Sequence, residues 1–244
     1  MRFHLPKPLH GWREFAGEVG VIVFGVLIAL CAQQLVEDWQ WRSDVRAADQ
    51  RMSKEIGYNV VLAYERFAID PCLRPRLAEL RDQLLTNDPT WQGSRAKFAN
   101  DIYKSGFPAV YRTPGRPWLQ ASWLTALNGG VIGHFRPERA QQLAYLFDAV
   151  GLLKQSQSEE EDTAETLGDL AFASPMTSAE RRANLKVVAR LDALDARILF
   201  DSRVLIDDAR EAGIDADGPL MKQLLEEQRD YRGACVRDPF KKAA

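Results

Sequence analysis

Apolar residues follow two patterns along this chain: one unbroken run near the start, and a helical repeat through most of the rest. Residues 19–36 contain no charged side chain, and Gln33 and Gln34 are the strongly polar members of the run. As a helix, this run would extend about 27 Å, close to the thickness of a bilayer hydrocarbon core. The pattern therefore predicts a membrane-spanning helix.

Three other interpretations of this run compete with a retained membrane helix. A cleaved signal peptide, with a possible cleavage site around Ala29 and Cys31, is opposed by Glu14 and Glu18, because acids are unusual before the apolar part of a signal. A lipid anchor on Cys31 is disfavoured by the bulky Leu30 before it. A buried helix of a soluble protein is disfavoured because no other segment is as hydrophobic. A retained membrane helix is favoured by the flanking aromatic residues, which are typical of membrane interfaces: Trp12, Phe15, Trp39 and Trp41.

The orientation does not follow from positive charges, since Arg and Lys occur on both sides of the run. We expect a signal anchor in a bacterial inner membrane, because the short N-terminal segment has nothing to export. The predicted organisation is a cytoplasmic tail at residues 1–18, a transmembrane helix at residues 19–36, and a helical periplasmic domain at residues 37–244.

After the apolar run, apolar side chains recur every three or four positions as far as about residue 67, which predicts one amphipathic helix continuing out of the bilayer. Asp70-Pro71 should end this helix, because the residue before a proline is biased away from helical geometry. A shorter helix should follow from about residue 74 to residue 85.

Later segments also read as helices. Residues 88–117 are rich in Pro and Gly and look irregular, except for a helical pattern at residues 95–104. A short helix near residues 118–127 should precede an Asn-Gly-Gly turn. Longer helices should begin at Pro137, since proline suits the first helical position, and at Thr177, which forms a capping box with Glu180.

The Thr177 helix should run to Gly213, and a last helix should span about residues 219–231. No strand-like alternation recurs along the chain. The sequence therefore predicts an all-α protein, in which a transmembrane helix continues into a long amphipathic helix and a helical bundle follows.

Composition narrows the possible functions. The 32 Lys and Arg residues nearly balance the 34 Asp and Glu residues, for a formal net charge of −2. Without a basic stripe, nucleic-acid binding is not expected. Of the three cysteines, Cys31 lies in the apolar run, while Cys72 and Cys235 either form one disulfide in an exported domain or remain two free thiols.

The chain shows little catalytic chemistry. The three histidines stand apart from other metal-ligating residues, and phosphate-binding or nucleophile-elbow motifs are missing, so we expect no enzyme and no cofactor. Residues 215–218 resemble part of a calcium loop but lack its first and last acidic ligands, which favours a turn and a helix start. The acidic run at residues 159–162 is interpreted as a solvated helix face. If the protein were an enzyme, the groups to test would be Arg112, Arg116 and His134.

The membrane helix itself offers contacts for a partner. Two acids one turn apart could pair with a basic group of another membrane protein, or simply suit a helix N-terminus. Small residues four positions apart, Ala16 with Gly20 and Gly25 with Ala29, allow helices to approach closely, including two copies of this chain. The residues concerned are Glu14, Glu18, Gly20, Gly25 and Ala29.

Two segments carry a family resemblance. The start WREFAGEVGVIVFGVLIAL and the Trp, small-residue, Gly and acidic-helix pattern of residues 118–146 resemble a family of uncharacterised bacterial single-pass membrane proteins. The resemblance covers roughly a fifth of the chain and implies location and architecture, but no catalytic residues.

These observations lead to one favoured function and one alternative. We expect a non-enzymatic envelope scaffold or accessory subunit, with the lipid bilayer and another membrane protein, or a second copy of itself, as partners. The alternative is a periplasmic small-molecule sensor whose bundle holds a ligand, with residues 88–117 as a lid. The short cytoplasmic segment argues against signalling by this chain alone.

Overall fold

The structure is a computed structural model that describes residues 12–86, 88–97, 99 and 109–239, with side chains from residue 15 onward. His4 and His10 therefore lie outside the described residues, as does the side chain of Glu14. The described chain is mostly helical, which confirms the all-α prediction. Its α-helices are α1 (Trp12–Leu84), α2 (Ala121–Asn128), α3 (Pro137–Glu165), α4 (Ser178–Glu211) and α5 (Gly218–Arg232).

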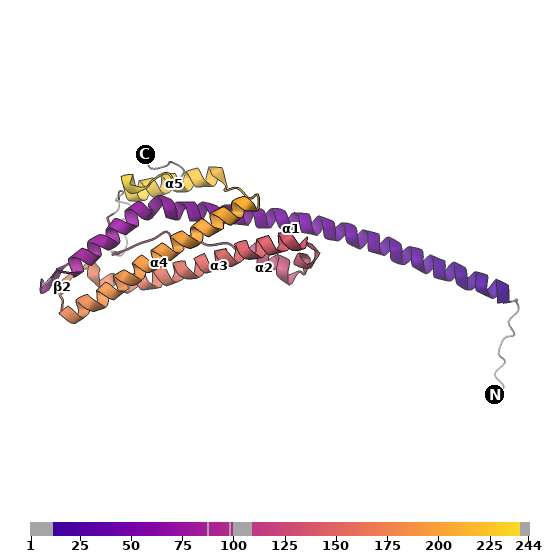
Figure 1. The fold of residues 1–244 in the computed structure, drawn as a ribbon, viewed down its shortest axis with the longest axis horizontal. Coiled ribbons are helices and arrows are strands. Elements are labelled where there is room, and N and C mark those ends of the chain that lie inside the picture. Colours follow the sequence, from indigo (N-terminus) through magenta and orange to yellow (C-terminus); the bar gives the residue numbers. More distant parts are fainter. Residues whose placement is uncertain (1–11, 87, 98, 100–108, 240–244) are drawn as a thin grey trace, which may run out of the picture.

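The longest element is α1, whose 73 residues extend for about 110 Å. Figure 1 shows its N-terminal half projecting alone, while its C-terminal half packs among the other helices. Within α1, an 18-residue apolar window has a mean hydropathy of 2.4, and none of it is buried. One helix near the N-terminus is therefore long and apolar enough to cross a membrane.

The helix does not end at Pro71, contrary to the sequence prediction, and the helix expected from residue 74 is the last part of α1. Each interior proline removes a backbone hydrogen bond and costs about 3 kcal/mol. The apolar stripe around the two prolines is nevertheless almost fully buried, and its five side chains contribute on the order of 10 kcal/mol: Ile69, Leu73, Leu77, Leu80 and Leu84. Packing thus outweighs the local preference, and α1 only bends in its C-terminal part (Figure 1).

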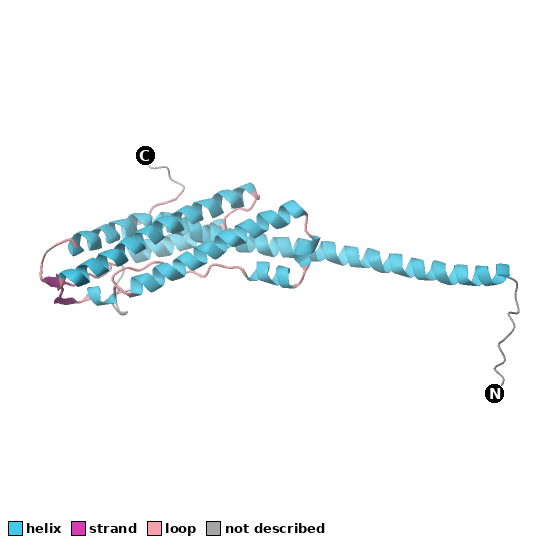
Figure 2. Ribbon diagram, turned by 60° about the horizontal axis from the view of Figure 1, so that its bottom comes forward, coloured by secondary structure: helices cyan, strands magenta, loops and turns pink. Residues whose placement is uncertain are grey.

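The helical domain is built around the C-terminal half of α1. Helix α4 packs against both α1 and α3, and α5 packs against α1. Figure 2 shows these helices running nearly side by side, with the short strands at the end of the domain that is far from the N-terminus. At the close approach between Gly57 of α1 and the loop before α5, an added Cβ would lie 2.9 Å from the carbonyl oxygen of Asp215.

Helix starts agree with the local signals in the sequence. Pro137 occupies the first turn of α3, and Thr177 and Glu180 form the capping box of α4. Asp217 caps α5 by accepting a hydrogen bond from the Leu220 amide, so the calcium-like segment is indeed a turn and a helix start.

Two local features differ from the prediction. Strands β1 (Thr90–Gln92) and β2 (Ala173–Pro175) pair antiparallel, and three residues are too few to show alternation in a sequence. Residues 95–97 are not helical, because backbone amides here bond to distant carbonyls, such as Ser94 to Leu170 and Ala96 to Ala109. The remainder of that predicted helix falls mostly outside the described residues.

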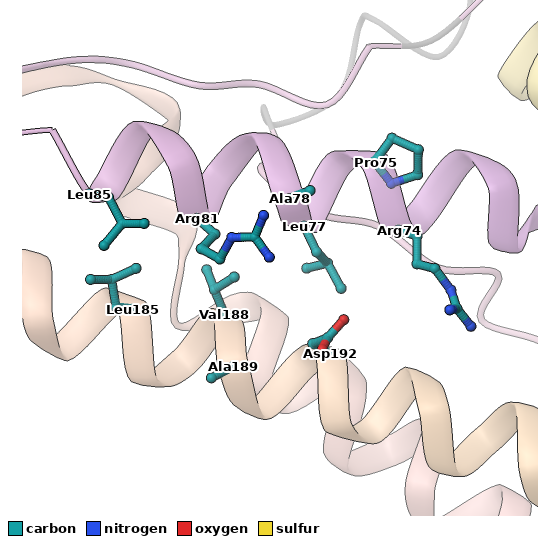
Figure 3. A pocket seen from close by; sticks show the side chains of 10 residues that line it. All are labelled: Arg74, Pro75, Leu77, Ala78, Arg81, Leu85, Leu185, Val188, Ala189 and Asp192. Atoms are coloured by element: carbon teal, nitrogen blue, oxygen red, sulfur yellow. The ribbon is translucent and has the colours of Figure 1, made fainter.

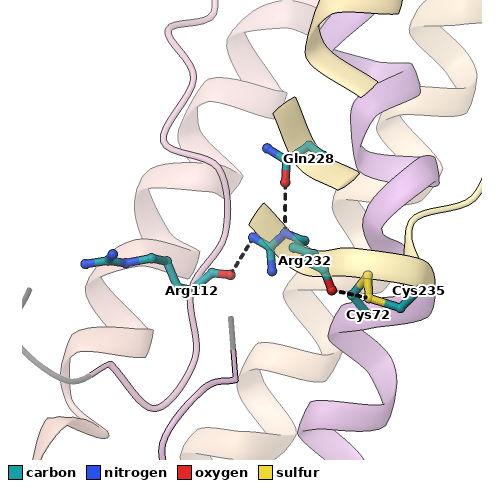
Figure 4. Close-up of a disulfide and its surroundings, with 5 residues drawn as sticks. All are labelled: Cys72, Arg112, Gln228, Arg232 and Cys235. Carbon is teal, nitrogen blue, oxygen red and sulfur yellow. Dashed lines mark hydrogen bonds between the residues drawn. A yellow bond between two sulfur atoms is a disulfide. The ribbon is translucent and has the colours of Figure 1, made fainter. Parts of the chain in front are cut away.

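A disulfide joins Cys72 of α1 to Cys235 in η4 (Gly233–Cys235), the 3-10 turn that follows α5. The two Cα atoms lie 5.2 Å apart across a sequence separation of 163 residues. Cys72 lies inside α1 rather than after it, so the bond fastens the last turn of the domain to the C-terminal part of its longest helix (Figure 4).

The disulfide predicts how many thiols react with a maleimide in the unfolded, unreduced protein. We expect one reactive thiol, that of the exposed Cys31, and three after reduction. Because the bond closes a long loop, reduction should lower the free energy of unfolding by up to about 5 kcal/mol, measured by denaturant titration. Cys31→Ser serves as the control, and three reactive thiols before reduction would contradict the assignment.

Candidate functional site

The predicted membrane-contact residues belong to the projecting half of α1, where the apolar side chains are exposed on every side. At 100° per residue, Glu18, Gly25 and Ala29 share one face of the helix, while Gly20 lies on the opposite face. An added Cβ at Gly20 or Gly25 would meet nothing within 4 Å. The structure thus aligns three of the predicted residues and separates Gly20 from them.

A cluster of charged residues occupies the core of the domain. Arg66 of α1 donates two hydrogen bonds to Glu160 of α3, at 2.8 and 3.1 Å, and one to Asp195 of α4, at 2.9 Å. The three side chains are 4%, 0% and 2% exposed. The Tyr111 hydroxyl donates a further hydrogen bond to Glu160, at 3.3 Å. This buried cluster therefore links three helices and the segment before α2.

Burial and mutual attraction shift the ionisation of these groups in opposite ways. Burial raises the pKa of the Asp195 carboxyl to about 6, although Arg66 beside it acts to lower the pKa. Burial alone would lower the pKa of Arg66, but Glu160, Tyr111 and Asp195 together raise it above its ordinary value. Arg66 therefore stays charged, whereas Asp195 titrates near neutral pH.

The sequence predicted that the acidic run at residues 159–162 forms a solvated helix face, and the structure contradicts this for part of the run. Glu160 is fully buried, whereas Asp162 is exposed. The helical spacing of apolar residues could have revealed this burial. Arg66, Glu160 and Asp195 each occupy a position at which the apolar stripe of their helix would place a core residue. One Arg and two acids at such positions are the pattern of a buried ion-pair network.

A second polar network connects α1 to α5. Glu65 has a 2% exposed side chain, which accepts hydrogen bonds from Arg116 at 3.2 Å and from Gln228 at 2.9 Å. Burial raises the pKa of Glu65, and Arg116 partly opposes that rise. Arg232 bridges Gln228 and the carbonyl oxygen of Arg112 (Figure 4). The network therefore holds the segment before α2 between α1 and α5.

Residues 109–119, which include the end of the suggested lid, are held by side chains of α1 and α3. Asn59 of α1 pairs with both the amide and the carbonyl of Leu119, at 2.9 and 2.8 Å. Trp118 is buried and donates to Gln157 of α3 at 2.8 Å. Within the suggested lid itself, Arg76 of α1 donates to the Val110 carbonyl oxygen at 2.9 Å and Gln157 donates to the Arg116 carbonyl oxygen at 3.0 Å, which opposes a lid function for residues 109–117.

The three residues named for a possible enzyme do not form one site. Arg116 pairs with Glu65 and Glu227, whereas His134 in η2 (Val131–His134) stacks on Trp41. Trp41 and Glu65 are 24 residues apart in α1, or about 36 Å along the helix. His134 therefore contributes a ring contact with Trp41 and does not approach Arg116. Across the described ranges, no group of three His, Cys, Asp or Glu side chains is placed to hold a metal ion.

A pocket of about 620 Å³ lies between the end of α1 and the start of α4. Figure 3 shows Leu77 and Leu85 of α1 facing Leu185 and Val188 of α4, with charged side chains around them. Those charged side chains are Arg74, Arg81 and Asp192. A mainly apolar pocket of this size with a few charged groups is typical of a small-molecule site.

The buried cluster predicts that two acids of α3, which are two positions apart, contribute very differently to the free energy of unfolding. Glu160→Gln should lower the free energy of unfolding by about 3–5 kcal/mol, because Arg66 would lose the main partner of its buried charge. Asp162→Asn removes an exposed acid two positions away and should change stability by less than about 0.5 kcal/mol. Denaturant unfolding of the two variants makes the comparison, and equal effects would rule out the cluster.

The raised pKa of Asp195 predicts that the stability of the folded protein depends on pH. Its carboxyl ionises near 3.8 ordinarily and near 6 in the folded protein, so its contribution to stability is complete below pH 4 and is lost as the pH rises through 6. Relative to Asp195→Asn, the wild type should lose up to about 3 kcal/mol of unfolding free energy between pH 4 and pH 7. A difference that stays constant over this range would contradict the shift.

Comparisons with known proteins give no match for this chain. No protein-family model matches it, and neither does any curated protein or solved structure. The family resemblance drawn from the sequence therefore stays a prediction. The functional argument depends on the residues and contacts of the chain itself.

Proposed function

We propose that this protein is a non-enzymatic accessory or scaffold subunit, anchored in a membrane by α1, that binds another membrane protein. The observation that carries the proposal is the continuity of α1. The same helix provides the exposed apolar segment and a central helix of the folded domain. A partner bound to the apolar segment would therefore be held at a fixed position relative to the domain.

The proposed location is a bacterial inner membrane, with residues 1–18 on the cytoplasmic side and the helical domain in the periplasm. Two observations support it. The apolar window of α1 is exposed throughout, as expected of a surface covered by lipid or by a partner. The Cys72–Cys235 disulfide favours an oxidising compartment, since such bonds are rare in the reducing cytosol.

The proposed contact face contains Glu18, Gly25 and Ala29. The two small residues allow a second helix to approach closely. A carboxylate at the membrane edge favours a basic or strongly polar group on that second helix. Gly20 lies on the opposite face of α1 and is not part of this contact.

A second candidate function is small-molecule binding by the helical domain. The pocket between α1 and α4 favours it, because about 620 Å³ suits a ligand of moderate size. Its apolar walls and its two Arg side chains would suit an apolar molecule with an acidic group. In this case the membrane helix would only tether the sensor domain.

The test is affinity purification of the tagged, full-length protein from its own membranes in a mild detergent. We expect a second membrane protein in constant proportion, identified by mass spectrometry and by the mass of the native complex. The double variant Gly25→Leu and Ala29→Leu should lose this partner, because leucine side chains prevent close approach of the helices. Gly20→Leu should retain it.

The alternative outcomes are distinct. Purification of the protein alone, or loss of the partner in Gly20→Leu only, would contradict the proposed contact. A small molecule released when the pure protein is unfolded, and missing from Ala189→Trp, would instead favour the sensor function, since Ala189 lines the pocket. A complex containing only copies of this chain would identify the partner as itself.

A further inference from the structure

A second hollow, of about 710 Å³, lies where α1 leaves its apolar run and first meets the domain. Its lining includes two tryptophans, three arginines and one histidine from two separate parts of the chain. Trp39, Trp41, Arg42 and Arg46 come from α1, while His134 and Arg136 come from the turn that leads into α3. The hollow is therefore lined by two segments that are far apart in the sequence, and its basic residues do not come from one helix alone.

Stacked rings hold the two walls together. The rings of Trp41 and His134 lie 3.8 Å apart between centroids and are tilted by 13°. Arg136 follows two residues later, at the N-cap position of α3. The turn is shaped for this approach, because Gly130 before it has a positive φ of 70°, which suits glycine. Arg136 is thus held near the arginines of α1.

The hollow carries an excess of positive charge. Arg42, Arg46 and Arg136 are all exposed, and Asp38 is the acidic residue of the lining. Among the described residues, none forms an ion pair with any of the three arginines. Arg42 and Arg46 lie one helical turn apart, and the Arg46 Nε donates to the Arg42 carbonyl oxygen at 3.2 Å. The three guanidinium groups are therefore open to an anion.

The distance of these arginines from the apolar run indicates which anion the hollow would bind. Arg42 lies six residues beyond the apolar run, or about 9 Å along the helix, and Arg46 about 15 Å. The polar layer of a bilayer is about 5–8 Å thick on each side. Long arginine side chains can reach back towards it, and Trp39, which is 68% exposed, is suited to the same layer. The hollow would thus open at the level of the lipid phosphates.

We propose that this hollow binds the phosphate of an anionic phospholipid in the membrane leaflet that faces the domain. The inference rests on the membrane anchoring proposed above, but not on a protein partner. Guanidinium groups can each donate two parallel hydrogen bonds to phosphate oxygens, and the tryptophans contact the glycerol region. A bound lipid would connect α1 to the turn before α3 and so fix the domain against the bilayer surface.

The experiment uses the full-length protein in vesicles of equal parts phosphatidylglycerol and phosphatidylcholine. After mild detergent extraction, native mass spectrometry gives the ratio of the two lipids retained by the protein. We expect enrichment of phosphatidylglycerol, on the order of fivefold for each contributing arginine. The triple variant Arg42→Gln, Arg46→Gln and Arg136→Gln should retain the two lipids in nearly equal amounts.

A charge-matched triple variant provides the control. Arg182→Gln, Arg197→Gln and Arg229→Gln remove three exposed arginines of α4 and α5 and should leave the enrichment unchanged. Equal loss in both triple variants, or no enrichment in the wild type, would overturn the proposal. Circular dichroism and non-reducing gel mobility verify that each variant is folded.

Two further measurements distinguish failure of the lipid site from failure of the membrane anchor, and lipid binding from binding of free phosphate. Flotation of the vesicles in a density gradient tests anchoring directly, so failure to float would refute the membrane anchor. Normal flotation without lipid enrichment would refute the lipid site alone. Inorganic phosphate at millimolar concentration should leave the enrichment intact, and its loss would reassign the hollow to a soluble phosphate.

Discussion

The continuity of one backbone determines how the rest of the protein is arranged. Helix α1 passes from the exposed apolar run into the core of the domain without a break in its hydrogen bonding large enough to end it. Every residue of α1 therefore has a rotational position set by the residues before it. The face that carries Glu18 and Gly25, the face that carries Arg42 and Arg46, and the face that buries Arg66 are related by a fixed geometry.

Local signals in the sequence were enough to predict where most helices begin. Pro137, Thr177 with Glu180, and the turn before α5 act within three or four residues, so their effect can be seen without the fold. Pro71 is the opposite case. Its local preference was outweighed by leucines whose burial depends on α4, a helix more than a hundred residues later in the chain. The residues around Pro71 in the sequence do not show that α4 would bury these leucines.

The polar interior was harder to predict than the apolar one. Glu160 sits in a run of four acids, and only its register with Leu146, Val150 and Leu153 distinguishes it from its exposed neighbour Asp162. Its partners, Arg66 and Asp195, come from helices whose relative rotation no sequence pattern specified. Such a network makes alternative packings costly, since any rotation of one helix would leave a buried charge without its partner. The network therefore selects one arrangement of α1, α3 and α4.

The disulfide turns residues 72–235 into a covalently closed ring, from which the N-terminal part of α1 emerges as an arm. A protease that cuts the chain once within this ring opens it but produces no separate fragment. Both new ends stay connected to the arm through Cys72. The whole domain would therefore remain attached to the N-terminal arm of α1 after a nick at any loop between the two cysteines, and only a second event, reduction of the bond, would release the C-terminal piece.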